Sequence, residues 1–190
     1  MKKLFAFLTA LVLMVSCVPF ALAEEAAEPA GKILVVYFSA TGTTRGVAEK
    51  LAEGLSADLY EIVPQEPYTD ADLNYSNSKS RTSMETDDPA CRPAIAGELP
   101  DLTAYDTIFI GYPIWWGDTP RILSSFVEQV DLTDKILAAF FTSGSSGMGS
   151  SMKHLEQQAG AGTWLEGKRF TSRTTVEELV SWAKGLGIAP

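Results

Sequence analysis

The chain has 190 residues, of which 46% are hydrophobic and 21% charged. This composition excludes a disordered, collagen-like or coiled-coil chain, and the length suits one domain rather than two. Fifteen Lys and Arg face 24 Asp and Glu, which gives a formal net charge of −9. So acidic a chain is not expected to bind nucleic acid, because phosphate binding needs clustered cations.

The first 23 residues have the pattern of a secretory signal peptide. A basic start, Lys2-Lys3, precedes an uncharged apolar run that ends in the small-x-small sequence of residues 21–23. We expect cleavage near Ala23 and an exported protein, whether periplasmic, extracellular or bound to the cell envelope. Two alternatives stay open: an uncleaved membrane anchor, or a lipoprotein signal with lipid on Cys17. We expect membrane contact only through one of these two.

Cleavage would leave a short flexible lead-in, residues 24–31, which is rich in Ala and Glu. It would also leave Cys91 as a lone cysteine, which cannot form an internal disulfide. We expect an incidental or buried thiol there, with a redox thiol as the minor alternative. One His and one Cys cannot build a metal site, and His154 is expected on the surface.

Residues 32–188 alternate between strand and helix patterns. Apolar, β-branched runs predict strands at 32–38, 59–63, 107–112, 136–141 and 163–170. Helical spacing of apolar residues predicts helices within 44–55, 119–130, 152–159 and 174–186, the last opened by a capping box of Thr174 and Glu177. The alternation predicts an α/β fold in which helices cover both faces of a parallel sheet.

One long connection, residues 65–104, interrupts this rhythm after the second strand. It is polar and rich in proline, and residues 70–85 within it could form a small helix. Connections of this length in a compact domain are usually functional or carry a helix of their own.

Three loops of unusual composition follow the strands, at the sheet edge where ligands of parallel sheets bind. Residues 39–44, Ser-Ala-Thr-Gly-Thr-Thr, offer hydroxyls and backbone N–H groups at a helix start, which suits a phosphate dianion. The loop lacks the closing Gly-Lys of a P-loop and the three glycines of a dinucleotide fingerprint. Plain capping of the helix by Thr43 or Thr44 is an equally good interpretation of this loop alone.

The other two loops suit a flat ring. Residues 113–118 place Trp115 and Trp116 at a strand end, where an indole can stack on an aromatic ligand. We expect one indole to pack under the neighbouring helix and the other to line the site. Residues 142–151 hold three glycines that allow a ligand edge to approach the backbone, although a flexible surface loop is the alternative.

With these motifs the whole mature chain resembles the flavodoxin family. The family's phosphate loop, [Ser/Thr]-x-[Ser/Thr]-Gly-x-[Ser/Thr], is matched by Ser39, Thr41, Gly42 and Thr44, and residues 111–117 and 142–147 resemble its two isoalloxazine loops. The resemblance implies a flavodoxin-like three-layer sandwich with a five-stranded parallel sheet of order 2-1-3-4-5. It also implies non-covalently bound FMN. The residues implied as cofactor ligands are Ser39, Thr41, Gly42, Thr43, Thr44, Pro113, Ile114, Trp115, Trp116, Gly117, Ser143, Gly144, Ser145 and Gly147.

The resemblance assigns the chemistry to the flavin rather than to a catalytic side chain. It implies that the Gly117 carbonyl can accept a hydrogen bond from reduced N5. Typical members carry acidic residues near the ring in both isoalloxazine loops, whereas here only Asp118 is present, in the second loop. We expect an apolar, acidic site that lowers the potential of the flavin. Within 65–104, Tyr68, Arg81 and Arg92 are candidates to cover the flavin or meet a substrate.

Three functions fit this pattern. The first is an electron carrier that docks its acidic face on a basic redox partner or reduces a small electron acceptor. The second is an FMN-dependent NAD(P)H:quinone-type oxidoreductase. The third is a non-redox binding module of the same fold, against which the intact loops argue.

Overall fold

The structure, a computed structural model, describes residues 31–188. The expected signal peptide and all of the lead-in except Gly31 lie outside the described residues. Within the described part of the chain, no helix combines the length and the apolar character needed to cross a membrane.

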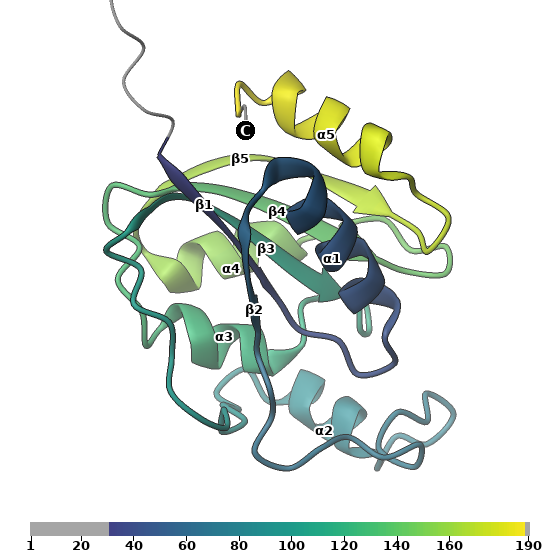
Figure 1. The fold of residues 1–190 in the computed structure, drawn as a ribbon. Coiled ribbons are helices and arrows are strands. Elements are labelled where there is room, and N and C mark those ends of the chain that lie inside the picture. Colours follow the sequence, from purple (N-terminus) through teal and green to yellow (C-terminus); the bar gives the residue numbers. More distant parts are fainter. Residues whose placement is uncertain (1–30, 189–190) are drawn as a thin grey trace, which may run out of the picture.

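Five parallel strands form one sheet of order β2-β1-β3-β4-β5, as expected (Figure 1). They are β1 (Lys32–Tyr37), β2 (Asp58–Glu61), β3 (Tyr105–Pro113), β4 (Ile136–Thr142) and β5 (Thr163–Phe170). The three central strands are buried over nearly their whole length, which explains their continuous apolar runs. The edge strands β2 and β5 are partly exposed, and their sequences are correspondingly more polar.

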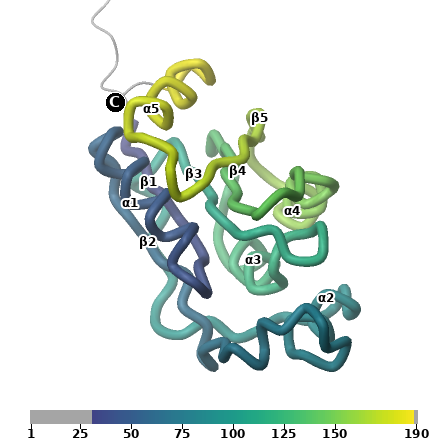
Figure 2. Tube along the Cα trace, turned by 90° about the vertical axis from the view of Figure 1, so that its right-hand side faces the viewer, coloured from purple at the N-terminus to yellow at the C-terminus, as the bar shows by residue number. Residues whose placement is uncertain are grey.

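Helices cover both faces of the sheet, so the molecule has three layers (Figure 2). On one face lie α1 (Thr43–Leu55) and α5 (Val176–Gly185), and on the other α3 (Arg121–Val127) and α4 (Ser151–Ala159). Alternate residues of β1 point to opposite faces: Val35 packs in the α1–α5 core and Val36 in the α3–α4 core. The fold therefore has two hydrophobic cores separated by the sheet.

The cap of α5 lies one residue later than the sequence pattern predicts. Thr175 and Glu178, not Thr174 and Glu177, form the capping box, with the Glu178 N–H donating to Thr175 Oγ1 at 3.3 Å. The Thr174 hydroxyl is engaged elsewhere, because its Oγ1 accepts from the Thr171 N–H at 3.1 Å.

The predicted helix over 70–85 is wrong for residues 70–80. Helix α2 spans Arg81–Asp87, and residues 70–80 form turns. The Asn74 and Asn77 side chains accept hydrogen bonds from the backbone N–H groups two residues on, at 2.9 and 3.0 Å. Such local bonds compete with the helical ladder. Figures 1 and 2 show the insertion, residues 65–104, at one end of the molecule beside α3.

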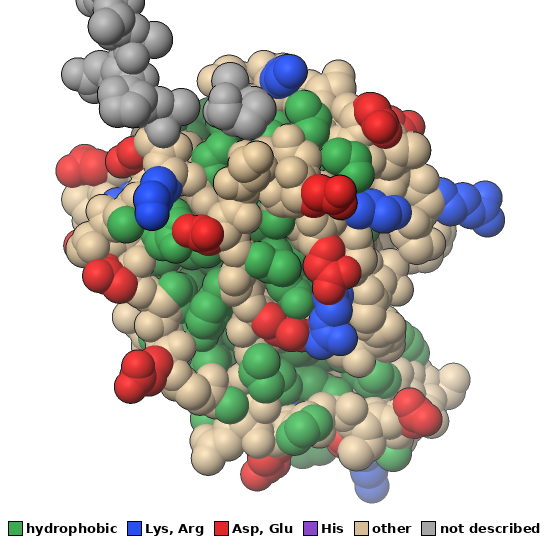
Figure 3. Space-filling view, viewed as in Figure 1, with side chains coloured by type: hydrophobic (Ala, Val, Ile, Leu, Met, Phe, Trp, Pro, Cys, Tyr) green, Lys and Arg blue, Asp and Glu red, His purple; other side chains and the backbone are tan. Residues whose placement is uncertain are grey.

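Acidic and basic side chains are interspersed over the face of the molecule drawn in Figure 3. Hydrophobic side chains gather in a band over β2 and toward the insertion in the same view. Leu59 and Val63, at the β2 edge, are among the exposed large hydrophobic residues. Strand β2 is only four residues long, which limits the unpaired backbone that an edge strand presents.

Candidate functional site

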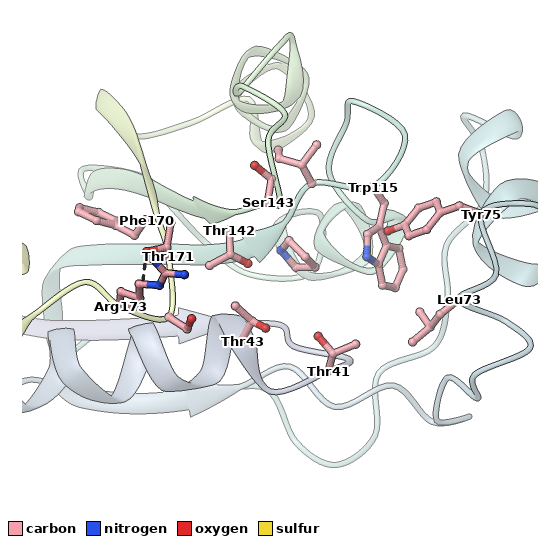
Figure 4. Close-up of a pocket in the computed structure, with 14 residues that line it drawn as sticks. Thr41, Thr43, Leu73, Tyr75, Trp115, Thr142, Ser143, Phe170, Thr171 and Arg173 are labelled. Carbon is pink, nitrogen blue, oxygen red and sulfur yellow. Dashed lines mark hydrogen bonds between the residues drawn. The ribbon is translucent and has the colours of Figure 1, made fainter.

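A cavity of about 630 Å³ lies at the carboxyl ends of β1, β3, β4 and β5 (Figure 4). Its size is typical of small-molecule and cofactor sites. Four connections that follow strands contribute to its wall, and the insertion contributes a fifth segment. The lining residues are Thr41, Thr43, Leu73, Tyr75, Pro113, Ile114, Trp115, Thr142, Ser143, Gly144, Phe170, Thr171, Ser172 and Arg173.

The first loop presents an uncapped helix N-terminus. The N-cap residue of α1 is Gly42, with a left-handed φ of 84°, and no side chain accepts a hydrogen bond from the first turn. The alternative of capping by Thr43 or Thr44 is therefore wrong. The Thr44 hydroxyl instead pairs with Thr142 Oγ1 at 2.8 Å and ties the loop to β4. Because Thr41 and Thr43 line the cavity, the free N–H groups of α1 lie at its edge and suit an anion.

A buried hydroxyl in the same loop lacks a partner. Ser39 Oγ is shielded from solvent and makes no hydrogen bond within the described residues. An unpaired buried hydroxyl costs about 1–3 kcal/mol. Together with the uncapped helix start, this orphaned donor fits the oxygen atoms of a phosphate group.

The second loop makes a two-residue turn. Trp115 and Asp118 exchange backbone hydrogen bonds of 3.0 and 2.9 Å, and the central residues Trp116 and Gly117 have φ of 52° and 80°, as type I′ turns require. Trp115 is only 4% exposed, yet it both packs against Phe38 and lines the cavity. The two indoles therefore do not divide these roles as expected, because Trp115 takes both of them. Trp116 is 48% exposed and does not line the cavity.

Trp116 instead contacts the insertion. Its ring centroid lies 5.4 Å from that of Tyr75, which lines the cavity. The turn also meets the third loop closely, since a Cβ on Gly149 would lie 2.9 Å from the Gly117 carbonyl oxygen. Only a glycine at position 149 leaves this carbonyl room.

The third loop is held by a cation. Arg169 on β5 donates hydrogen bonds to the carbonyls of Ser143 and Gly144 at 2.9 and 2.7 Å. These two residues line the cavity, whereas Ser145 and Gly147 do not. Arg169 therefore restrains the third loop at Ser143 and Gly144, next to the cavity.

The structure brings half of the sequence-predicted site residues into the cavity wall. Among those that do not line it, Ser39, Gly42 and Thr44 support the first loop and Trp116 and Gly117 form the second turn. Thr142 lies in the predicted third loop, although it was not among the individual ligands; sequence reasoning missed the β5–α5 connection (residues 170–173) and Leu73 and Tyr75 of the insertion. The connection could have been inferred, because the carboxyl end of every parallel strand meets the same edge. Nothing in the sequence singles out Leu73 or Tyr75.

The three side chains proposed from the insertion bond within it or to the end of α3, not to the cavity. Tyr68 donates to Glu85 at 2.7 Å, and the Arg81 guanidinium lies 4.0 Å from the centroid of the Tyr68 ring. Arg92 pairs with Glu128. None of Tyr68, Arg81 and Arg92 lines the cavity. Burial and the Glu85 hydrogen bond raise the pKa of Tyr68, so this phenol stays neutral.

The expectation of an acidic site is wrong. The one charged residue in the cavity wall, among those described, is Arg173. Asp118 is turned to other partners: its carboxylate accepts from the Thr119 N–H at 2.8 Å and from Arg121 at 3.5 Å, and it lies 3.0 Å from Nδ1 of His154.

Other chemistry-bearing groups lie outside the site. Burial raises the pKa of the Cys91 thiol, which disfavours a reactive thiolate. Burial also raises the pKa of Tyr112 to about 12. No group of three His, Cys, Asp or Glu side chains suited to a metal occurs among residues 31–188.

The fold and the cavity define a doubly wound α/β protein with a ligand site at the carboxyl edge of its sheet. The chain belongs to the flavodoxin family, because the family model described as Flavodoxin matches residues 32–186. No curated protein matches it.

Several solved structures are similar. A protein of Bacteroides eggerthii DSM 20697, assigned as a flavoprotein, is 44% identical with a TM-score of 0.78, covering 83% of this chain and 98% of its own. One of Bacteroides uniformis ATCC 8492, with the same assignment, is 41% identical with a TM-score of 0.78, covering 82% and 99%. A flavoprotein of Lactobacillus acidophilus NCFM in complex with FMN is 27% identical with a TM-score of 0.62, covering 74% and 93%.

Proposed function

We propose that this chain binds FMN without a covalent bond and acts as an electron-transfer flavoprotein. The observation that carries the proposal is the uncapped N-terminus of α1 beside the orphaned Ser39 hydroxyl, at the edge of a cavity whose opposite wall is aromatic. Family membership and the FMN complex of the Lactobacillus protein support it.

Different parts of the cavity wall would bind different parts of FMN. Ser39, Thr41 and Thr43, with the free N–H groups of α1, would hold the phosphate. Trp115, Tyr75 and the other apolar lining residues would cover the ring and exclude water, and the backbone of Ser143 and Gly144 would meet its polar edge. Bound FMN supplies one- and two-electron transfer, which the protein directs by binding and electrostatics.

The Gly117 peptide is the candidate partner of flavin N5. A glycine at φ 80° has no Cβ to oppose reorientation of its peptide, and open space surrounds the position where a Cβ would lie. Gly117→Ala should therefore shift the midpoint potential of bound flavin. An unchanged potential would refute the role.

An FMN-dependent oxidoreductase acting between NAD(P)H and a quinone-type acceptor is the second candidate. The observation that favours it is the contribution of Leu73 and Tyr75 to the cavity wall, since the insertion thereby adds apolar surface to the site against which a second planar molecule would pack. Direct oxidation of NAD(P)H by the purified protein would separate this function from that of a carrier, which needs a protein partner or a small electron acceptor.

The deciding experiment is the visible spectrum of the expected mature chain, residues 24–190, before and after addition of FMN. A flavin band that survives desalting supports the proposal. Failure to retain FMN after reconstitution refutes both redox functions and leaves a binding module.

Two serine variants sharpen this test. Ser39→Ala removes the orphaned hydroxyl of the site, and Ser124→Ala removes a similarly buried, unpartnered hydroxyl of α3. A hydrogen bond to a charged group contributes about 1.5–3 kcal/mol, so Ser39→Ala should weaken FMN binding about tenfold or more. It should not destabilise the FMN-free protein. Ser124→Ala should leave FMN binding unchanged, and equal effects of the two variants would contradict the assignment.

We also propose that the protein is exported, with cleavage near Ala23. In support, the family match starts at residue 32, so residues 1–31 are additional to the family domain. The mass of the protein recovered from the cell envelope or medium would distinguish cleavage near Ala23 from a retained anchor and from lipid on Cys17.

A further inference from the structure

Arg173 is the one described arginine whose side chain has no protein partner. Arg45, Arg81, Arg92 and Arg121 each pair with a carboxylate, and Arg169 donates to two backbone carbonyls. The guanidinium of Arg173 makes neither an ion pair nor a hydrogen bond with residues 31–188, although it forms part of the cavity wall.

The backbone that carries Arg173 is fixed against α1. Lys50 of α1 donates hydrogen bonds to the carbonyls on either side of Arg173, those of Ser172 at 3.1 Å and Thr174 at 2.9 Å. The Arg173 N–H itself donates to Thr171 Oγ1 at 3.3 Å. The unpaired guanidinium is therefore held beside the helix that supplies the phosphate-binding N–H groups.

Arg173 lies at one particular end of the cavity. Figure 4 shows Arg173 beside Thr43 and Thr171, at the end of the cavity away from Trp115 and Tyr75. The cavity thus has hydroxyls, a helix N-terminus and a cation toward one end, where Phe170 also lies, and the aromatic side chains of Trp115 and Tyr75 at the other. This polarity matches a ligand that carries its anionic group and its planar ring at opposite ends.

We propose that Arg173 is a phosphate-binding residue that holds the 5′-phosphate of FMN together with the first loop and the N-terminus of α1. This inference rests on the proposed function. The planar guanidinium forms charge-assisted, bidentate bonds with phosphate oxygens, which hydroxyl and amide donors cannot match in strength. Arg173 thereby makes the site select FMN over riboflavin by charge as well as by shape.

The test compares two ligands in matched variants of the full mature chain. Dissociation constants for FMN and riboflavin are measured by quenching of flavin fluorescence in the wild type, Arg173→Gln, Arg173→Lys and Arg45→Gln. Arg45 is the control: it lies in the first turn of α1, but its charge is neutralised by Glu61 at 2.5 Å on the β2 side. Urea titration of each variant confirms that it folds.

We expect Arg173→Gln to weaken FMN binding about tenfold, while riboflavin binding changes less than about twofold. Arg173→Lys should weaken FMN binding less than Arg173→Gln, because lysine keeps the positive charge but lacks the paired N–H donors of the guanidinium. The loss should shrink at high salt, because the guanidinium is exposed and screened. Arg45→Gln should bind both flavins as the wild type does.

Equal losses for FMN and riboflavin would overturn the proposal, since they would show that Arg173 merely supports the loop. Unchanged FMN affinity would also overturn it, and would leave Arg173 for the phosphate of a second, dinucleotide substrate. A wild-type chain that binds neither flavin would refute the proposed function itself, and the role of Arg173 with it.

Discussion

Arg121 joins the insertion to the second cavity loop through a buried guanidinium. The residue is 8% exposed and donates to the carbonyls of Glu85 and Thr86 at 3.2 and 2.7 Å, while reaching Asp118 at 3.5 Å. These carbonyls belong to α2, and Asp118 closes the Trp116–Gly117 turn. One side chain therefore ties together segments that are far apart in the sequence.

Arg121→Gln should lower the free energy of unfolding by about 3 kcal/mol. Two bonds from a charged donor are lost, at about 1.5–3 kcal/mol each, and the shorter glutamine recovers part of one. Removing one partner of a buried ion pair costs about 3–5 kcal/mol, and the long 3.5 Å contact to Asp118 places this case at the lower end. For a domain of this size the loss corresponds to a fall in Tm of about 6–12 °C.

Urea denaturation followed by circular dichroism measures this loss, and Arg92→Gln is the matched control. Arg92 also bonds two insertion carbonyls, those of Pro89 and Cys91, and a carboxylate, but its side chain is 31% exposed. Exposed pairs contribute at most about 1 kcal/mol. If Arg121→Gln cost no more than Arg92→Gln, the argument that burial makes the Arg121 bonds valuable would be refuted.

Three further predictions concern the fold. Gly111→Ala should lower the free energy of unfolding by about 2 kcal/mol, because the alanine Cβ would lie 2.1 Å from a Phe140 ring carbon. In a double-mutant cycle, adding Phe140→Leu should recover part of this loss, and strictly additive effects of the two substitutions would contradict the clash. Thr175→Ala should lower the free energy of unfolding, measured by urea titration, by about 1 kcal/mol, whereas Thr175→Ser should change it little. Equal losses for the two variants would argue against the capping role. Arg92 holds the pKa of Glu128 below its ordinary value of 4.5, so the stabilisation is present above that pH and is lost as the pH falls through the folded pKa. Glu128→Gln should therefore reduce the fall in the free energy of unfolding at acid pH by less than about 1 kcal/mol. An unchanged fall would show that the pair contributes nothing to stability.

Local patterns were sufficient for the sheet and its helices. Central strands buried on both faces must be continuously apolar, and helices packed on one face must carry an apolar stripe. The length of each apolar run and the spacing of its apolar residues were therefore enough to identify these elements. The pattern failed at residues 70–80, where asparagine side chains compete with the helix for backbone hydrogen bonds. It also misplaced the cap of α5 by one residue, because either threonine satisfies the motif and only packing chose between them.

The sequence by itself determined the fold class, the edge of the sheet where a ligand binds and the phosphate-type loop after β1, because each depends on residues adjacent in the chain. Only the tertiary structure decided which side chains line the cavity. Leu73, Tyr75 and Arg173 come from segments 100 residues apart, and their meeting depends on how the insertion and the β5–α5 connection pack. The charge of the site was decided in the same way: Asp118 turns to Arg121 and His154, while Arg173 is left facing the cavity without a partner. Arg121 is only three residues from Asp118 in the chain, but the contact with His154 and the absence of a described partner for Arg173 depend on distances between separate segments, which no local pattern encodes.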